Sequence, residues 1–221
     1  MSGQRNEVVS KIWRGLDPFS GFPTRMYQVE IQGWGETHHF LSDTIEQVRP
    51  KIVVEMGVWK GASTLVMAKT MQDLDLDGVV IAVDTWLGAW DHWLDDAWFA
   101  DLGIEVGRPK LQHKFMANVL SLDLQDLVVP LPLDSLNAVR VLAAHQLTAD
   151  IVHLDGAHDY ASVTADLNAW WPIIRAGGVL IGDDYNLNGV WPDVRRSFDE
   201  FLSINQVSRI ETAPPKIRIW K

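Results

Sequence analysis

The chain has 221 residues, of which 47% are hydrophobic and 22% charged, a composition typical of a folded globular protein rather than a disordered one. Its 19 basic and 29 acidic residues give a formal charge of -10, and no stripe of Lys or Arg could follow a nucleic-acid backbone. The lack of cysteine excludes disulfides, thiolate metal sites and cysteine nucleophiles. Any chemistry must therefore use oxygen and nitrogen groups.

Residues 1–39 form a predicted N-terminal lead segment, a candidate lid rather than a separate domain. Pro and Gly recur at turn spacing in DPFSGFPTR (17–25), which favours irregular structure. From His39 to Arg49, apolar residues lie at helical spacing, and Pro50 ends the predicted helix. We expect one main domain, residues 40–221.

After Pro50, short β-branched runs alternate with longer helical patterns. This rhythm is typical of crossover units on a parallel sheet that helices cover on both faces. The runs 207–211 and 216–220, joined by TAPP, predict an antiparallel C-terminal hairpin. The predicted fold is α/β, Rossmann-like and doubly wound, with a mostly parallel seven-stranded sheet. The other expected strands span 51–57, 79–84, 127–131, 150–156 and 178–184.

No part of the sequence indicates export or membrane insertion. The first 30 residues lack a basic start followed by an apolar core, and no apolar run approaches the roughly 20 residues that cross a bilayer. We therefore expect a cytoplasmic protein that binds neither membrane nor nucleic acid. The 11 tryptophans are compatible with a homodimer.

The end of the first predicted strand carries glycines at a spacing that favours a ligand site. Ligands bind open sheets of this kind beyond the carboxyl ends of the strands. In EMGVWKGAS (55–63), Gly57 permits a tight turn and Gly61 permits close approach of a ligand or of the next helix. The spacing departs from G-x-G-x-x-G, which disfavours a dinucleotide and a nicotinamide-dependent oxidoreductase. A turn without a ligand is the alternative.

Asp84 ends the second predicted strand. A carboxylate there can accept hydrogen bonds from both hydroxyls of a ribose, although it could instead cap the following segment. Trp59 and Trp86 are the tryptophans nearest the strand ends, and we expect both beside the ligand.

Three further carboxylates, Asp155, Asp183 and Asp184, follow the fourth and fifth predicted strands. Like charges brought together at neighbouring strand ends repel one another unless they are protonated or bridged by a cation. Oxygen ligands without cysteine indicate a hard cation such as Mg²⁺, with Ca²⁺ or Mn²⁺ as alternatives. The other interpretation is that one or two of these residues cap helices or face solvent.

His158 follows Asp155 by three residues, in LDGAHDY (154–160). An imidazole at this turn could take a proton at neutral pH, so His158 is the candidate base. His153 lies inside the predicted strand and is expected to be a hydrogen-bonded core histidine.

Four stretches together resemble the class I S-adenosylmethionine-dependent methyltransferases, over about residues 40–221. Within this superfamily the chain looks most like the metal-dependent O-methyltransferases that act on sugars and other hydroxylated natural products, the macrocin O-methyltransferase-like group. The stretches are VVEMGVWKGAS (53–63), VVIAVDTWLG (79–88), IVHLDGAHDYASVTADL (151–167) and WPIIRAGGVLIGDDY (171–185).

The resemblance implies positions for the cofactor and the metal. The first strand end would wrap the methionine and ribose parts of S-adenosylmethionine, Asp84 and its neighbours the ribose, and the residues after the third strand the adenine. The implied cofactor-binding residues are Glu55, Gly57, Val58, Trp59, Gly61, Ser63, Asp84, Thr85, Trp86, Asp134, Ser135 and Asp155. The implied metal ligands are Asp155, Asp183 and Asp184.

The expected reaction is methyl transfer to a hydroxyl of a small molecule, assisted by Mg²⁺, with His158 and Asp155 as catalytic residues. Related metal-dependent catechol methyltransferases carry a lysine where this chain has His158, and Asp-Asn where it has Asp183-Asp184. Residues 1–34 and 85–109 are candidates for the acceptor pocket or a lid. The alternatives are a metal-independent O- or N-methyltransferase and a non-catalytic partner subunit that binds the cofactor.

Overall fold

The computed structural model describes residues 3–33, 37–186 and 189–221. In this part of the chain, one seven-stranded sheet has the order β3-β2-β1-β4-β5-β7-β6. Neighbours from β3 to β5 pair in parallel, whereas β7 pairs antiparallel with both β5 and β6. The predicted α/β fold with a C-terminal hairpin is confirmed. The strands are β1 (Ile52–Met56), β2 (Val79–Val83), β3 (Val128–Leu131), β4 (Ala149–Leu154), β5 (Ile174–Gly182), β6 (Arg209–Ala213) and β7 (Lys216–Trp220).

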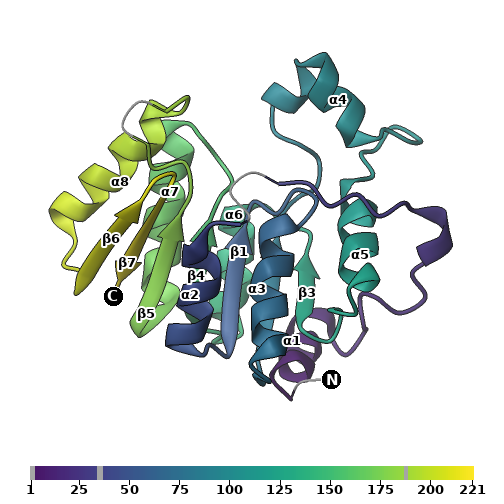
Figure 1. The fold of residues 1–221 in the computed structure, drawn as a ribbon, viewed down its shortest axis with the longest axis horizontal. Helices are drawn as coiled ribbons and strands as arrows, with labels where there is room; N and C mark the ends of the chain where they lie inside the picture. Colours follow the sequence, from purple (N-terminus) through teal and green to yellow (C-terminus); the bar gives the residue numbers. More distant parts are fainter. Residues whose placement is uncertain (1–2, 34–36, 187–188) are drawn as a thin grey trace.

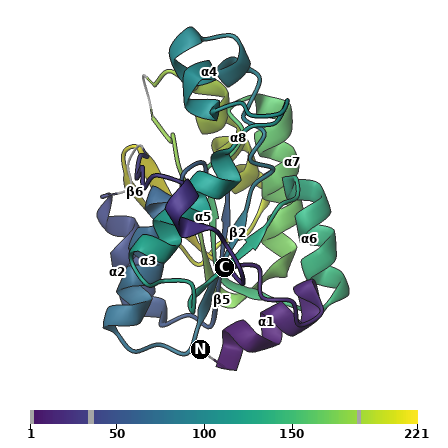
Figure 2. The same ribbon diagram turned by 90° about the vertical axis from the view of Figure 1, so that its right-hand side faces the viewer.

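Helices cover both faces of the sheet (Figures 1 and 2). Apolar residues of α1, α6, α7 and α8 pack on one face, and those of α2, α3 and α5 on the other. Successive side chains of a strand point to opposite faces of the sheet. Val54 therefore lies in the apolar layer beneath α1, α6, α7 and α8, called the first layer, and Val53 lies in the second layer, beneath α2, α3 and α5. The longer helices are α1 (Gly3–Trp13), α2 (His39–Val48), α3 (Ala62–Asp73), α5 (Leu111–Ser121), α6 (Ser135–Ala144), α7 (Tyr160–Trp170) and α8 (Pro192–Ile204).

The lead segment contains the helix α1, which was not predicted from the sequence. Val8 is fully buried in the first layer, and the Trp13 indole Nε1 donates a hydrogen bond to the Pro130 carbonyl at 3.0 Å. The buried Arg5 guanidinium pairs with Asp17 at 2.9 Å. These contacts attach α1 to the edge of the sheet at β3, while a short 3₁₀ helix follows at Thr24–Met26.

Residues 85–110 link β2 to α5 and contain elements that the sequence analysis did not place. They form a 3₁₀ turn at Asp91–Trp93 and the short helix α4 (Asp96–Leu102), which stands apart from the sheet at the top of Figure 1. Asp95 caps α4 by accepting hydrogen bonds from the Ala97 and Trp98 N–H groups. A third 3₁₀ turn, Trp171–Ile173, joins α7 to β5.

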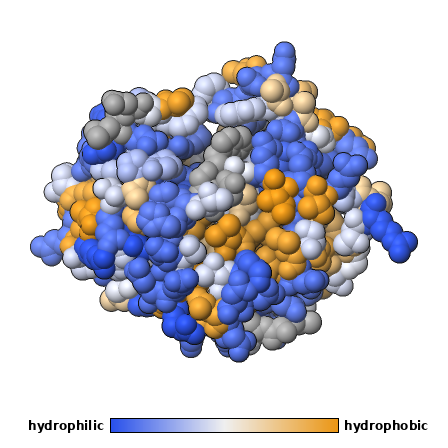
Figure 3. All heavy atoms as spheres, in the orientation of Figure 1, coloured by the Kyte–Doolittle hydropathy of each residue, from blue (hydrophilic) through white to orange (hydrophobic). Residues whose placement is uncertain are grey.

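Hydrophilic side chains dominate the face seen in Figure 3, with hydrophobic groups scattered among them. In the described ranges, no helix combines the length and the apolar character needed to cross a membrane.

Gly57, directly after β1, lies against the backbone that follows β4. Its φ is +85°, and a Cβ atom there would lie 2.0 Å from the carbonyl oxygen of Asp155.

We expect Gly57→Ala to lower the free energy of unfolding by more than about 2 kcal/mol, because the backbone segments at Gly57 and Asp155 must move apart. Gly15→Ala is the matched control, since Gly15 has φ +83° and nothing within 4 Å of the added carbon. It should cost about 1 kcal/mol. Urea unfolding measures both, and equal losses would contradict this explanation.

Candidate active site

A cavity of about 910 Å³ opens at the carboxyl ends of the strands. It lies where the connections from β1 and β4 lead to opposite sides of the sheet, the usual ligand position in this architecture. Its volume is near the upper end of the range for small-molecule sites, so it has room for a cofactor together with a small acceptor. Loops after all five parallel strands line it.

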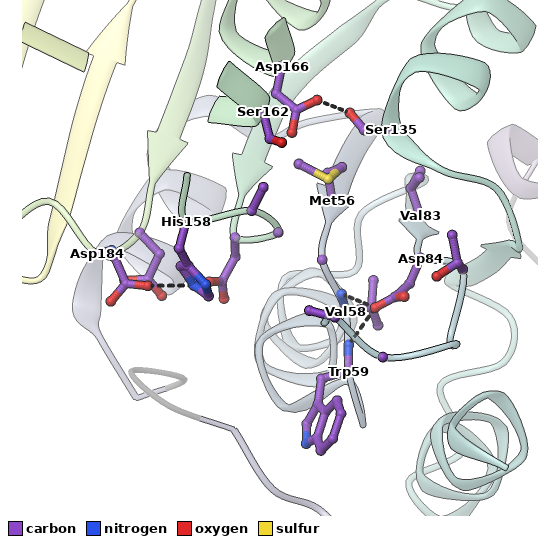
Figure 4. Close-up of a pocket in the computed structure, with 18 of the residues that line it drawn as sticks. Met56, Val58, Trp59, Val83, Asp84, Ser135, His158, Ser162, Asp166 and Asp184 are labelled. Atoms are coloured by element: carbon purple, nitrogen blue, oxygen red, sulfur yellow. Dashed lines mark hydrogen bonds and ion pairs between the residues drawn. The ribbon is translucent and has the colours of Figure 1, made fainter. Parts of the chain in front are cut away.

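The loop after β1 is held by Asp84. One carboxylate oxygen, Oδ2, accepts hydrogen bonds from the Val58 and Trp59 N–H groups at 2.8 and 2.9 Å (Figure 4). The other, Oδ1, accepts from the Trp86 N–H at 2.7 Å. Burial raises the pKa of Asp84, and the three N–H groups oppose this shift by stabilising the ionised form. Asp84 therefore lines the cavity and also fixes the loop that would contact a ligand.

Three of the predicted cofactor-binding residues lie behind this loop and do not line the cavity. Glu55 is fully buried and accepts hydrogen bonds from the hydroxyls of Ser63 and Thr64. Trp86 is buried too, and its Nε1 donates to the Trp59 carbonyl at 2.9 Å. Gly61 begins α3 with φ +91°, where a Cβ atom would strike the Phe115 ring. The predicted positions that do line the cavity are Gly57, Val58, Trp59, Ser63, Asp84, Thr85, Asp134, Ser135 and Asp155.

At the end of the cavity beside β3, Asp134 caps α6 by accepting from the Asn137 N–H at 2.9 Å. The Ser135 hydroxyl donates to Asp166 on α7 (Figure 4). It also accepts from the Trp170 indole at 2.7 Å. Burial raises the pKa of Asp166 to about 6. The sequence analysis missed Asp166 and its neighbour Ser162, which both line the cavity. Their spacing of four residues, which places them on one helix face, was the available signal.

The acidic residues after β4 and β5 do not all converge on one point. Ligand atoms of His153, Asp155 and Asp183 lie within 4.8 Å of one another. Asp184 instead turns towards His158, with its Oδ2 3.1 Å from the imidazole Nε2 (Figure 4). Burial, followed by the charge of Asp183, raises the pKa of Asp155 well above its usual range. Negative charge is therefore in excess at this end of the cavity.

Lys216, at the start of β7, was not singled out from the sequence. Its fully buried ammonium group forms an ion pair with Asp183 and lies 3.5 Å from Nε2 of His153. The other imidazole nitrogen of His153, Nδ1, lies 3.1 Å from Glu55. His153 is thus a buried, hydrogen-bonded histidine, as its place within the strand predicts.

Aromatic rings border the open part of the cavity. His158 stacks on Trp191 with ring centroids 4.3 Å apart and an interplanar angle of 11°. His92 lies between Trp59 and Trp98, at centroid distances of 4.5 and 4.8 Å, and burial lowers its pKa. Residues from two segments thus contribute to the lining, while their role as a lid stays a prediction. They are Thr85, Gly88, Ala89, His92 and Trp98, and Gln32 and Gly33 of the lead segment.

The charged side chains that line the cavity are acidic, apart from the imidazoles of His92 and His158. Among the lining residues in the described part of the chain there is no Lys or Arg. The six lining carboxylates are Asp84, Asp134, Asp155, Asp166, Asp183 and Asp184.

The fold is shared with several solved methyltransferase structures. An O-methyltransferase from Bacillus cereus, solved in complex with SAH, is 14% identical, with a TM-score of 0.58 over 98% of this chain and 97% of that one. The O-methyltransferase NovP is 20% identical, with a TM-score of 0.61 over 97% and 88% of the two chains. CalS11, a TDP-rhamnose 3'-O-methyltransferase of calicheamicin biosynthesis, is 18% identical, with a TM-score of 0.53 over 81% and 76%. No curated protein sequence matches the chain.

Residues 54–185 match the sequence profile of the methyltransferase domain family. This match covers more than half of the 221 residues, and the chain belongs to that family. The sequence-based assignment to the class I S-adenosylmethionine-dependent methyltransferases is confirmed, and the structural neighbours are O-methyltransferases, the group that the sequence resembles.

Asp166 should make stability depend on pH. Its pKa is about 6 in the folded protein and near 3.8 when exposed, so the folded state binds the proton more tightly. The free energy of unfolding should therefore fall as pH rises from about 4 to about 6. Asp166→Asn, whose side-chain oxygen can still accept from Ser135, should be more stable than the wild type by about 1–3 kcal/mol at pH 7.5 and gain little at pH 4. Urea unfolding at the two pH values tests this, and a pH-independent difference would contradict it.

Proposed function

We propose that this methyltransferase transfers the methyl group of S-adenosylmethionine to a hydroxyl of a small molecule, a sugar or another hydroxylated natural product. The observation that carries this proposal is the pairing of His158 with Asp184 at the cavity wall. An imidazole oriented by a carboxylate is an arrangement suited to removing a hydroxyl proton. The similarity in fold to O-methyltransferases supports it as well.

The cofactor binds along the ends of β1, β2 and β3 in this proposal. The glycine turn at Gly57 lets the loop after β1 lie beside the methionine part, and Asp84 and Thr85 face the ribose. Asp134 and Ser135 lie beside the adenine. The support is that these residues line one continuous cavity, which ends at His158.

Methyl transfer is an in-line displacement, so the acceptor oxygen must approach the methyl group opposite the sulfur. The new O–CH₃ bond forms as the S–CH₃ bond breaks, and S-adenosylhomocysteine leaves. When the Nε2–H group of His158 donates a hydrogen bond to Asp184, Nδ1 is left to accept the proton of the acceptor hydroxyl. Stacking on Trp191 fixes the plane of the imidazole for this step.

Mg²⁺ fits the acidic end of the cavity, where Asp155 and Asp183 would hold it, because Asp184 is turned towards His158. The donor set consists of carboxylate oxygens, which a hard cation prefers, and a bound cation would favour the ionised form of Asp155, whose pKa is raised first by burial. A bound divalent ion would orient the acceptor hydroxyl and lower its pKa. Metal-independent transfer is the second candidate, favoured by the ion pair between Lys216 and Asp183.

The acceptor is neutral or positively charged in this proposal. The described lining offers no Lys or Arg to a phosphate or carboxylate, and the ionised aspartates of the lining would repel one. Aromatic rings of Trp59 and Trp191 can cover a flat or cyclic acceptor and attract a cation. A sugar linked to a nucleoside diphosphate, the substrate named for CalS11, fits such a lining less well than a free hydroxylated molecule.

His158→Ala should reduce kcat about 10²–10⁴-fold, because the acceptor proton loses its base. Calorimetry should show unchanged affinity for S-adenosylmethionine, since the cofactor lies at the other strand ends. His145→Ala, at an exposed position after α6, is the control and should keep full activity. Full activity of His158→Ala would contradict the assignment of the base, and failure of the wild type to bind the cofactor would contradict the proposed function.

Charge selectivity can be measured with catechols of similar shape. Transfer of a labelled methyl group to dopamine and to 4-methylcatechol should exceed transfer to 3,4-dihydroxybenzoate by about tenfold, a difference of about 1.4 kcal/mol between a neutral or cationic and an anionic acceptor. High salt should narrow the difference by screening the exposed carboxylates. Faster transfer to the acid would contradict the proposed acceptor class.

A further inference from the structure

The antiparallel direction of β7 brings a lysine to an edge that otherwise collects carboxylates. The five parallel strands present their carboxyl ends at the cavity, whereas β7 runs the other way and presents its first residue there. That residue is Lys216, which is fully buried. Its neighbour Ile217 pairs in register with Gly182, directly before Asp183.

The ammonium group of Lys216 lies among the groups best placed to bind a metal. In the described part of the chain, His153, Asp155 and Asp183 are the set whose ligand atoms approach one another within 4.8 Å. Lys216 contacts two of these three residues, Asp183 through an ion pair and His153 at 3.5 Å. A buried carboxylate needs a countercharge, and here a side chain of the protein supplies it.

We propose that Lys216 is the resident cation of this cluster, competes with a divalent ion for Asp183, and thereby sets the metal affinity of the site. The consequence is a protein that folds without metal and binds Mg²⁺ weakly through the oxygens that face the cavity. The inference deepens the proposed function, because it concerns the metal that would assist methyl transfer. It can be tested without cofactor, acceptor or turnover.

Lys216→Met removes the charge and keeps an apolar side chain of similar length. Asp155 and Asp183 then share a buried site without a lysine, and a divalent ion becomes their only strong countercharge. In the presence of a chelator, the midpoint of thermal unfolding of Lys216→Met should be lower than that of the wild type. Titration with Mn²⁺, followed by electron paramagnetic resonance, should show binding about tenfold tighter or more than in the wild type, and Mn²⁺ or Mg²⁺ should raise the midpoint more than in the wild type.

Two further variants separate charge from packing. Lys216→Met/Asp183→Asn lacks both charges of the pair, so it should recover stability in chelator and respond little to metal. Lys216→Arg keeps the charge and should bind Mn²⁺ as weakly as the wild type. Where Lys216→Met does not fold, Lys216→Gln compared with Lys216→Arg measures the same difference.

Two results would overturn the proposal. The first is Mn²⁺ binding by Lys216→Met or Lys216→Gln no tighter than by the wild type, which would make Lys216 a structural ion-pair partner only. The second is tight Mn²⁺ binding by the wild type that substitution of Lys216 leaves unchanged. Cofactor calorimetry and methyl transfer report on the proposed function separately, so either conclusion can fail while the other holds.

Discussion

The site depends on a chain of buried polar side chains behind the strand ends. It runs from Asp183 through Lys216 and His153 to Glu55, which also binds two hydroxyls of α3. Charged groups are stable in a protein interior only when they are paired, so each member constrains the position of the next. Because β7, β5, β4 and β1 each contribute one member, the chain holds four strand ends in fixed relation to the cavity.

The carboxylates at the strand ends fall into two groups, according to what their oxygens contact. Glu55 and Asp84 use their oxygens on groups of the protein and thereby shape the loop after β1. Asp155 and Asp184 line the cavity, where they are available to a ligand or to His158. The first kind provides a rigid loop beside the proposed cofactor, and the second provides charge beside the proposed acceptor. Rigid positioning on one side and reactive groups on the other are what an in-line transfer requires.

The sequence predicted the sheet well because parallel strands are buried on both faces and therefore read as short apolar, β-branched runs. Helix α1 was not predicted in this way, because the packing of its few buried apolar residues against the edge of the sheet at β3 is evident only in the folded structure. Helix α4 was not predicted either, because its seven residues, DAWFADL, are too few to show a helical periodicity. Short or marginal helices owe their stability to tertiary packing, which local periodicity does not encode.

The sequence by itself determined the doubly wound sheet, the glycine turn at Gly57 and the placing of Asp84, Asp155 and Asp183 at strand ends, because periodicity and turn chemistry are local properties. Only the tertiary structure decided which of these side chains face the cavity. Glu55 meets His153 across 98 positions of the chain, and Lys216 meets Asp183 across 33 and through a strand reversal. Burial and charge pairing act between residues that are close in space, and they turned Glu55 inward, brought Lys216 to the acidic edge and placed Asp166 in the cavity wall.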